Sequence, residues 1–514
     1  MRRTVAAAVA LSTALSLSAL AASAHALTST TSSRPDSRTQ ARAQDRAQAQ
    51  RALRVADRVV SGDAPHVDAS MALLRLRLTM SALPRADRRQ AAAILARPTD
   101  HPDFYGETYS VKAKRECAGH ICLHWVPTTR DAPPDKAWVG RMLKLMNQVW
   151  SFEVKKLGYH RPVTDGTRGG GGSGKFDVYL KELYHQGLYG ETVAERPSAT
   201  NKRLYSSYLL LDNDFASRQY HADPIQTARV TAAHEFFHAI QYGYDAREDH
   251  WFMESSATWM EEQYDDASND NRQYLPWSQL QHPDRPLDTY DPSSFEQYGD
   301  WVFFEYLSER YGRRVVRSAW QHAASFTHGG GEYSAAAIRS ALRSHGGMTQ
   351  VFGRYASGNT DPARTYAEGS AYPTAGAAAT VRLGRSSPST RWKTYRVHHL
   401  ASVNVEAKPG ASLRSRAWRL EVTVQAPKRA TMPAVVVRVD RRHHPTTVTS
   451  VHLDDTGQGL LEVPFSRATT QRVTVTLANA STTFTCHTGG GYSCDGTPTA
   501  PHPRFALRLR VVRP

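Results

Sequence analysis

The chain has 514 residues, 40% of them hydrophobic and 22% charged, a balance that excludes wholesale disorder. The net charge is +16, yet residues 101–379 carry 29 basic and 34 acidic side chains, whereas residues 380–514 carry 20 and 7. A chain that is basic along its whole length, as in a simple nucleic-acid binder, is therefore not expected, and the length allows two or three domains.

Residues 1–26 have the pattern of a secretory signal peptide. Two arginines precede an uncharged run from Val5 to Ala22, and the run ends in Ala-Ser-Ala and Ala-His-Ala, two small-residue cleavage patterns. An uncleaved membrane anchor is the alternative, because the run is long. No later segment is apolar enough to span a bilayer, so we expect a secreted, extracellular mature chain without a transmembrane segment.

The four cysteines form two close pairs, Cys117 with Cys122 and Cys486 with Cys494. An even number in an exported chain favours disulfides, and proximity favours the two local ones. A cysteine-based zinc site is less favoured, because the spacings match no familiar ligand pair.

Residues 27–104 predict a flexible linker followed by a small helical unit. The Ser-, Thr-, Gln- and Arg-rich composition of residues 27–50 is typical of a linker, and a helical pattern follows to about Leu95. Because this unit lies between a signal peptide and an enzyme-like core, we hypothesise that it is a prosegment.

Residues 105–364 predict a mixed α/β domain, and residues 379–514 predict a basic all-β sandwich. In the first, apolar runs indicate strands at residues 121–126, 176–183 and 207–212, and helical patterns cover residues 137–158, 224–242, 251–264, 297–310 and 334–343. In the second, short alternating runs such as WRLEVTVQA are separated by turn residues. The expected fold class is α+β, followed by a C-terminal β-sandwich.

One helix carries an HExxH motif, formed by His234, Glu235 and His238. Histidines four residues apart lie on one helix face, so both imidazoles can reach a single zinc ion, and Glu235 can take a proton from the attacking water. Chance alone produces this motif in roughly one chain in twenty, so it needs support from elsewhere in the sequence.

That support is Glu254, sixteen residues after His238 in the segment WFMESSATWMEE. A turn after Gly243 would let a second helix return antiparallel and bring Glu254 to the metal. Two histidines and one glutamate leave a position open, as in catalytic zinc sites. Glu261 and Glu262 follow on the same helix, where a solvated face is the favoured interpretation.

The two segments together resemble the gluzincins, zinc peptidases with HExxH and a downstream glutamate ligand. WFMESSA is similar to the WLNEGFA segment of the aminopeptidase branch, although the spacing from HExxH is shorter here. The layout of residues 65–315 also resembles a group of bacterial secreted metallopeptidases with a helical leader. The shared segments are LARPTD, FDVYL, YLLLDND, HEFFHAIQYGYD, WFMESSATWMEE and YGDWVFFEYLSERYG.

The resemblance implies three further features. Glu254 becomes the third zinc ligand, and Tyr298, in FEQYGDW, becomes the nearest match to the tyrosine that binds the oxyanion, although its glycine follows at once instead of three residues later. The strand at Tyr205–Leu211 becomes the edge strand that pairs with substrate backbone. The amine-binding GxMEN segment of the aminopeptidases is not found, which slightly favours an endopeptidase.

Three weaker signals concern other ligands. Asp212 and Asp214 offer oxygens of the kind calcium takes, but turn capping is favoured. Gly169–Lys175 nearly matches a phosphate-binding loop, yet Phe176 replaces the required Ser or Thr, so no nucleotide cofactor is expected. The basic C-terminal domain is a candidate for binding a polyanionic cell-wall surface, with a solvated surface as the alternative.

We therefore expect a secreted metallopeptidase with one zinc ion per chain that hydrolyses protein or peptide substrates. His234, His238 and Glu254 are the expected metal ligands, and Glu235 and Tyr298 the expected catalytic residues. A surface-binding protein with an inactive or structural HExxH unit is the main alternative, and a metal hydrolase of non-peptide substrates is a third.

Overall fold

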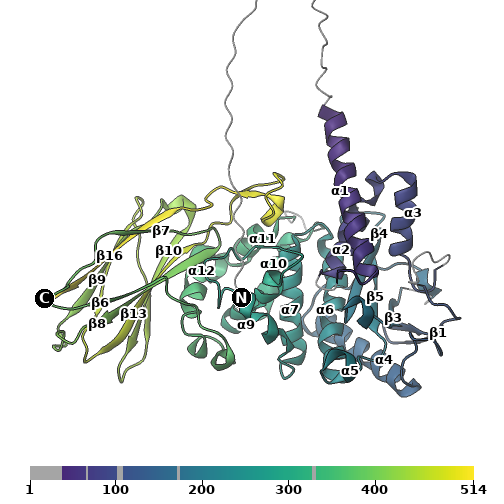
Figure 1. The fold of residues 1–514 in the computed structure, drawn as a ribbon, viewed down its shortest axis with the longest axis horizontal. Coiled ribbons are helices and arrows are strands. Elements are labelled where there is room, and N and C mark those ends of the chain that lie inside the picture. The colour runs from purple at the N-terminus through teal and green to yellow at the C-terminus, as the bar shows by residue number, and fades with distance from the viewer. Residues whose placement is uncertain (1–36, 65–66, 101–107, 171–173, 327–330, 514) are drawn as a thin grey trace, which may run out of the picture. The chain divides into compact units, whose positions relative to one another are not determined.

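The computed structural model describes residues 37–64, 67–100, 108–170, 174–326 and 331–513 (Figure 1). The chain divides into Met1–Gln44, of which only the first turns of α1 are described, and a compact unit, Asp45–Pro514. The predicted signal peptide lies outside the described residues. Within them, no helix combines the length and apolarity that a bilayer crossing requires.

Helices and strands alternate first, and strands alone follow. The helices are α1 Ser37–Val60, α2 Ala69–Thr79, α3 Arg85–Ile94, α4 Lys136–Trp150, α5 Ser217–Tyr220, α6 Pro224–Asp245, α7 His250–Asp265, α8 Glu296–Gly299, α9 Trp301–Tyr311, α10 Arg314–Ala323, α11 Ser334–Ala341 and α12 Gly347–Gly358. The strands are β1 Lys114–Ala118, β2 Ile121–Trp125, β3 Phe176–Lys181, β4 Gly190–Pro197, β5 Tyr205–Asp212, β6 Ala379–Leu383, β7 Lys393–Arg396, β8 Ala401–Pro409, β9 Arg419–Gln425, β10 Pro433–Arg441, β11 Thr447–Ser450, β12 Gln458–Pro464, β13 Thr470–Asn479, β14 Phe484–Thr485, β15 Thr497–Pro498 and β16 Arg504–Val512.

A five-stranded sheet of order β1-β2-β3-β5-β4 organises the first half. Strands β2, β3 and β5 are parallel, and β1 and β4 are antiparallel to their neighbours. The interior strands are buried along their length because both faces are covered. Leu209 and Leu211 of β5 face the core shared with α4 and α6, whereas Tyr208 and Leu210 face the core shared with α1, α2 and α3.

The N-terminal helices pack against this domain, which corrects the predicted flexible linker; the predicted prosegment at residues 27–104 stays a prediction. The expected linker is helical from Ser37 onward, and α1 from Ala49 on packs with α2 and α3 on one face of the sheet. Arg97, just after α3, is 1% exposed and pairs with Asp177 of β3 and Glu195 of β4. A boundary near residue 104 would cut through one hydrophobic core.

The second half begins with packed helices and ends in a β-sandwich. A five-stranded sheet, β11-β10-β13-β8-β6, faces a four-stranded sheet, β12-β9-β16-β7, across an apolar core of mainly Val and Leu. The predicted α+β class and C-terminal sandwich agree with this arrangement. Both predicted disulfides, Cys117–Cys122 and Cys486–Cys494, are confirmed.

The sandwich is docked firmly on the helices. Helix α12 packs on β10 and β13, and a Cβ atom added at Gly353 would lie only 2.7 Å from that of Ala434, so the close approach requires glycine. A buried hydrogen bond joins Asp288 to His399, with 2.8 Å between the carboxylate oxygen and Nε2.

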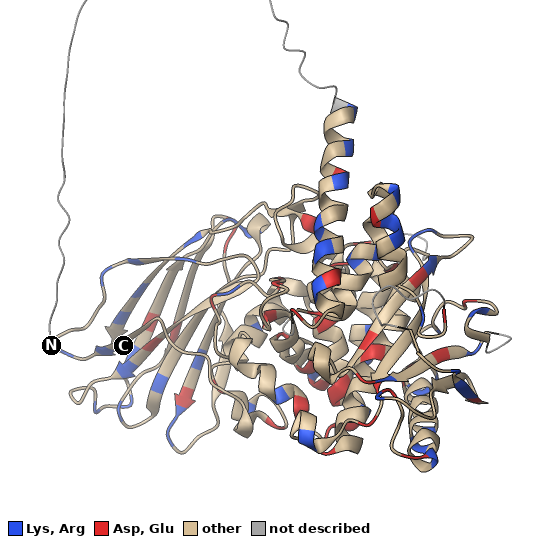
Figure 2. Cartoon of the chain, turned by 45° about the vertical axis from the view of Figure 1, so that its right-hand side comes forward, with Lys and Arg blue, Asp and Glu red and all other residues tan. Residues whose placement is uncertain are grey.

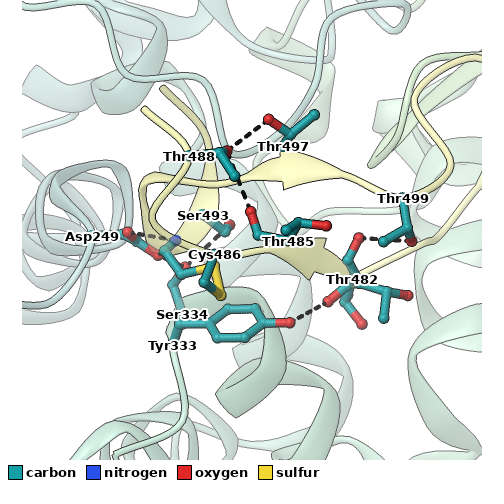
Figure 3. The surroundings of a disulfide bond; sticks show 12 residues. Asp249, Tyr333, Ser334, Thr482, Thr485, Cys486, Thr488, Ser493, Thr497 and Thr499 are labelled. Carbon is teal, nitrogen blue, oxygen red and sulfur yellow. Dashed lines mark hydrogen bonds between the residues drawn. A yellow bond between two sulfur atoms is a disulfide. The ribbon is translucent and has the colours of Figure 1, made fainter. Parts of the chain in front are cut away.

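The Cys486–Cys494 loop contacts the start of α7 (Figure 3). The Cys494 backbone N–H donates to the Asp249 carboxylate, with both oxygens at 2.8 Å, and the Ser334 hydroxyl donates to the same group. Asp249 is the residue before α7 and makes no side-chain cap within that helix. The sandwich thus holds the N-terminal end of α7.

Basic residues are spread along the strands of the sandwich (Figure 2). Arg396 and Arg504 are paired across β7 and β16 and exposed, and the Arg508 guanidinium lies 5.2 Å from the centre of the Trp392 ring. Binding of a polyanionic surface by this domain stays a prediction.

Candidate metal centre and cleft

Helix α6 places both histidines and Glu235. Asp223 caps its start by accepting hydrogen bonds from the backbone N–H groups of Ile225 and Gln226, and Pro224 occupies the first turn, where its missing N–H costs nothing. Every residue from Val230 to Asp245 is buried, because α6 runs between the sheet and α7. The HExxH segment is therefore held rigidly at the centre of the domain.

The structure brings His234, His238 and Glu254 together. Glu254, on α7, has one carboxylate oxygen 3.2 Å from His234 Nε2 and the other 3.2 Å from His238 Nε2. The two Nε2 atoms are 3.0 Å apart. This is one of two groups among the described residues whose donor atoms lie close enough together to hold a metal ion.

The other ring nitrogen of each histidine has its own acceptor. His234 Nδ1 lies 2.6 Å from the Glu261 carboxylate, and His238 Nδ1 lies 2.7 Å from Gln241 Oε1. Gln241 Nε2 donates to the Met253 carbonyl, which turns its oxygen toward the histidine. Both Nδ1 atoms therefore donate, and both Nε2 lone pairs point at the same space, as in metal-binding histidines with an orienting partner.

This donor set fits a divalent metal ion. Two lone pairs 3.0 Å apart repel unless a cation lies between them, and both Glu254 oxygens are buried without a hydrogen-bond partner among the described residues. Burial alone would lower the pKa of His234, but the adjacent carboxylates of Glu254 and Glu261 hold it well above its usual value. Burial would raise the pKa of Glu254, but the two adjacent imidazoles hold it below its usual value. The pocket thus attracts positive charge.

Glu235 is fixed from the opposite side by the N-terminal unit and the edge strand. Its Oε2 accepts hydrogen bonds from the Ser70 hydroxyl at 2.9 Å and the Thr192 hydroxyl at 2.8 Å. A Cβ atom at Gly190 would lie 2.9 Å from Thr231 Cγ2 and 3.1 Å from Glu235 Cγ, so glycine lets β4 approach α6. The second carboxylate oxygen of Glu235 remains available for proton transfer.

A cleft of about 600 Å³ opens beside these residues. His234, Glu235 and His238 line it, and Tyr274, Trp277, Phe295 and Tyr298 contribute aromatic side chains. The Tyr298 ring is stacked near His234, with ring centres 6.1 Å apart, and burial raises its pKa. The structure therefore places Tyr298 in the cleft beside the predicted ligands.

The strand next to the cleft is β4, not the predicted Tyr205–Leu211. In the order β3-β5-β4, β5 is an interior strand and β4 is the edge. The sequence pattern drew attention to β5 because its apolar run is continuous, whereas β4, GETVAERP, has only a short apolar stretch. Gly187–Gly190 and the start of β4 line the cleft.

Two groups of site residues are missed by sequence reasoning. Glu261 and Glu262 were expected on a solvated helix face, and this is wrong, because they are 7% and 5% exposed. Glu261 lies seven residues after Glu254, which is two helical turns along the same face of α7. This spacing is the sequence signal that could have placed Glu261 near Glu254 and His234. No sequence pattern points to Asp68 and Ser70, because the contact between α2 and α6 joins segments that are far apart in the chain.

Asp68 lies at the N-terminal end of α2 in an acidic environment. It caps α2 by accepting from the Met71 backbone N–H through Oδ1, whereas Oδ2 is buried, and the Asp68 carboxyl lies close to the side chains of Glu254 and Tyr290. It lines the cleft. Burial, and then the negative charge of Glu254, raise the pKa of Asp68 well above its usual value.

The calcium ligands considered at Asp212 and Asp214 have other partners. Asp212 accepts from the backbone N–H groups of Leu183, Phe215 and Asp214, and Asp214 accepts from that of Ala216. Turn capping therefore accounts for both. The second metal-compatible group, Glu262, Asp266 and Glu368, consists of carboxylates alone, and Glu368 already pairs with Arg272.

Substituting Glu261 by glutamine is expected to weaken metal binding by about 10- to 100-fold, because the acceptor that orients His234 loses its charge. Competition with a chelator measures this affinity. Glu262→Gln is the matched control, since Glu262 is the next residue on α7 and accepts from Asn271 rather than from a histidine. Equal affinities for the two variants would contradict the orienting role of Glu261.

Comparison with known proteins adds little. No protein-family model matches the chain, and no curated protein matches it. Two solved structures overlap with 27% of the chain at a TM-score of 0.16: the pre-peptidase C-terminal domain of collagenase from Bacillus anthracis (5% identity, 97% of that chain) and CorA, a surface-associated copper-binding protein of Methylomicrobium album BG8 (9% identity, 100% of that chain). Likeness at this score supports neither a fold nor a function.

Proposed function

We propose that this protein is a secreted zinc metallopeptidase. The observation that carries the proposal is the convergence of two imidazole Nε2 atoms and a buried carboxylate, with both Nδ1 atoms engaged elsewhere. Two histidines and one glutamate form the ligand set of catalytic zinc, which keeps a position open. The two disulfides are consistent with an extracellular protein.

A zinc ion in this site would polarise the scissile carbonyl and lower the pKa of the attacking water. Glu235 takes the proton from that water and later donates it to the leaving amine. Ser70 and Thr192 hold one oxygen of Glu235, so the other keeps a constant direction during both transfers. Tyr298 is the candidate donor to the developing oxyanion, and β4 offers its edge to the substrate backbone.

The test is metal content together with turnover. Purified wild-type protein is expected to hold about one zinc ion per chain and to cleave members of a peptide library, and His238→Ala is expected to lose both, because a ligand is removed. His322→Ala is the control, since His322 lies on α10 outside the cleft and should keep both properties. A full zinc content in His238→Ala would contradict the proposed ligand set.

A further inference from the structure

We propose that the N-terminal helical unit closes one end of the cleft and that Asp68 there binds the free amino terminus of the substrate, which makes the protein an aminopeptidase. The inference rests on the proposed metallopeptidase function and names its substrate class. The sequence slightly favours an endopeptidase; the geometry of α2, β4 and the cleft points the other way.

The edge of β4 is open only in part. The Thr192 N–H points away from β5 and donates to the Ser70 hydroxyl at 2.9 Å, and the Tyr242 hydroxyl lies 3.4 Å from the Thr192 carbonyl oxygen. Alternation along an antiparallel strand gives Gly190, two residues earlier, the same outward direction, and Gly190 lines the cleft. A peptide that pairs with β4 can therefore form hydrogen bonds at Gly190. It must end before Thr192, because the Ser70 hydroxyl already accepts the hydrogen bond from the Thr192 N–H.

The closed end of the cleft is acidic. Asp68 is two residues from Ser70, is 8% exposed, and lines the same cleft that Glu235 lines. Carboxyl groups buried close together are costly unless a positive group comes to them. The α-ammonium of a peptide supplies that charge on any substrate, whereas a terminal carboxylate would be repelled. A closed end with this charge selects the amino terminus.

The N-terminal helical unit closes this end of the cleft permanently. Met71 and Leu74 of α2 are fully buried in the core that contains α6 and α7, and Leu73 and Leu76 are fully buried against the sheet. Removing the N-terminal helical unit after folding would expose the apolar surfaces that these four side chains cover. It would also leave Asp177 and Glu195 without Arg97. The unit therefore behaves as a wall of the cleft rather than a removable leader.

The first experiment uses the unmodified, zinc-loaded full chain and pairs of peptides that differ only in N-terminal acetylation. Free peptides are expected to be cleaved after their first residue with kcat/KM about 100-fold or more above the acetylated ones, as for loss of one partner of a buried charge pair. Equal rates for each pair, or internal cleavage of acetylated peptides, would overturn the inference and leave the metallopeptidase intact. No cleavage of either form would instead refute the proposed function.

The second experiment measures binding without turnover. Zinc-loaded Glu235→Gln protein is titrated calorimetrically with the same peptide pairs, with and without Asp68→Asn. Asparagine caps helices as well as aspartate, so α2 should remain folded. The preference for the free amine is expected to disappear in the double variant. Asp135→Asn is the matched control, since Asp135 caps α4 away from the cleft.

Two outcomes would overturn the role of Asp68. One is an unchanged preference for the free amine after Asp68→Asn. The other is faster cleavage of all peptides by Asp68→Asn in the otherwise unmodified protein, which would show that Asp68 blocks the metal centre instead of binding substrate.

Discussion

Substituting Glu235 by glutamine is expected to lower kcat/KM for peptide hydrolysis by about 10³- to 10⁴-fold while zinc stays bound. Glutamine keeps the size of the side chain and can still accept hydrogen bonds from Ser70 and Thr192, but it cannot take a proton. Because Glu235 is not among the three predicted ligands, metal content should equal that of the wild type. Progress curves and zinc analysis on the same preparation separate the two effects.

Glu305→Gln is the matched control for this substitution. Glu305 is a buried glutamate on α9 that accepts from Gln263 and Ser308, and it does not line the cleft. Turnover of the control should therefore resemble that of the wild type. If Glu235→Gln retained wild-type turnover at full zinc content, Glu235 would not be the general base.

The second large effect concerns stability and involves Arg97. We expect Arg97→Met to lower the free energy of unfolding by about 3–5 kcal/mol, because buried carboxylates lose their partner. The Arg97 guanidinium lies 2.5 Å from Asp177, 2.6 Å from Glu195 and 2.5 Å from Asp165. Denaturant unfolding followed by tryptophan fluorescence measures the change. A loss below about 1 kcal/mol would contradict it.

Arg168→Met provides the comparison. Arg168 also pairs with Glu195, but its side chain is 33% exposed, so the expected loss is about 0–1 kcal/mol. The effect of Arg97 should also depend on pH. Burial would raise the pKa values of Asp177 and Glu195, but hydrogen bonds, from His124 and Arg97 to Asp177 and from Arg97 to Glu195, hold both below their usual 3.8 and 4.5. Their stabilisation is present above those values and lost as the pH falls, so the difference between wild type and Arg97→Met should shrink in acid.

Local patterns in the sequence predict much of the fold. The expected helix at residues 224–242 is α6, the expected strand at residues 207–212 is β5, and the alternating runs after residue 379 are strands of the sandwich. These elements have strong periodicity or long apolar runs, so their type is decided locally. One expected helix, residues 297–310, is split at Asp300 into α8 and α9.

What the sequence did not reveal depends on contacts between distant segments. Ser70 and Glu235 are 165 positions apart, and only the packing of α2 along β4 brings them together. The edge position of β4 is likewise a property of strand order, which no local pattern encodes. By contrast, His234, His238 and Glu254 occupy two consecutive helices, and their proximity follows from a short antiparallel connection.

The disulfide loop at Asp249 bears on how the protein must be handled. A fragment ending between residues 364 and 379 would lose the Cys494 N–H that binds Asp249 and the His399 ring that binds Asp288, and it would expose the side of α12 that packs on β10. Only Ser334, among the described residues, would then hold the Asp249 carboxylate at the start of the helix that carries Glu254, and the buried Asp288 would be exposed to water. Reducing agents act on the same support, because they open the Cys486–Cys494 ring that shapes it. Full-length, oxidised material is therefore the form in which activity should be sought.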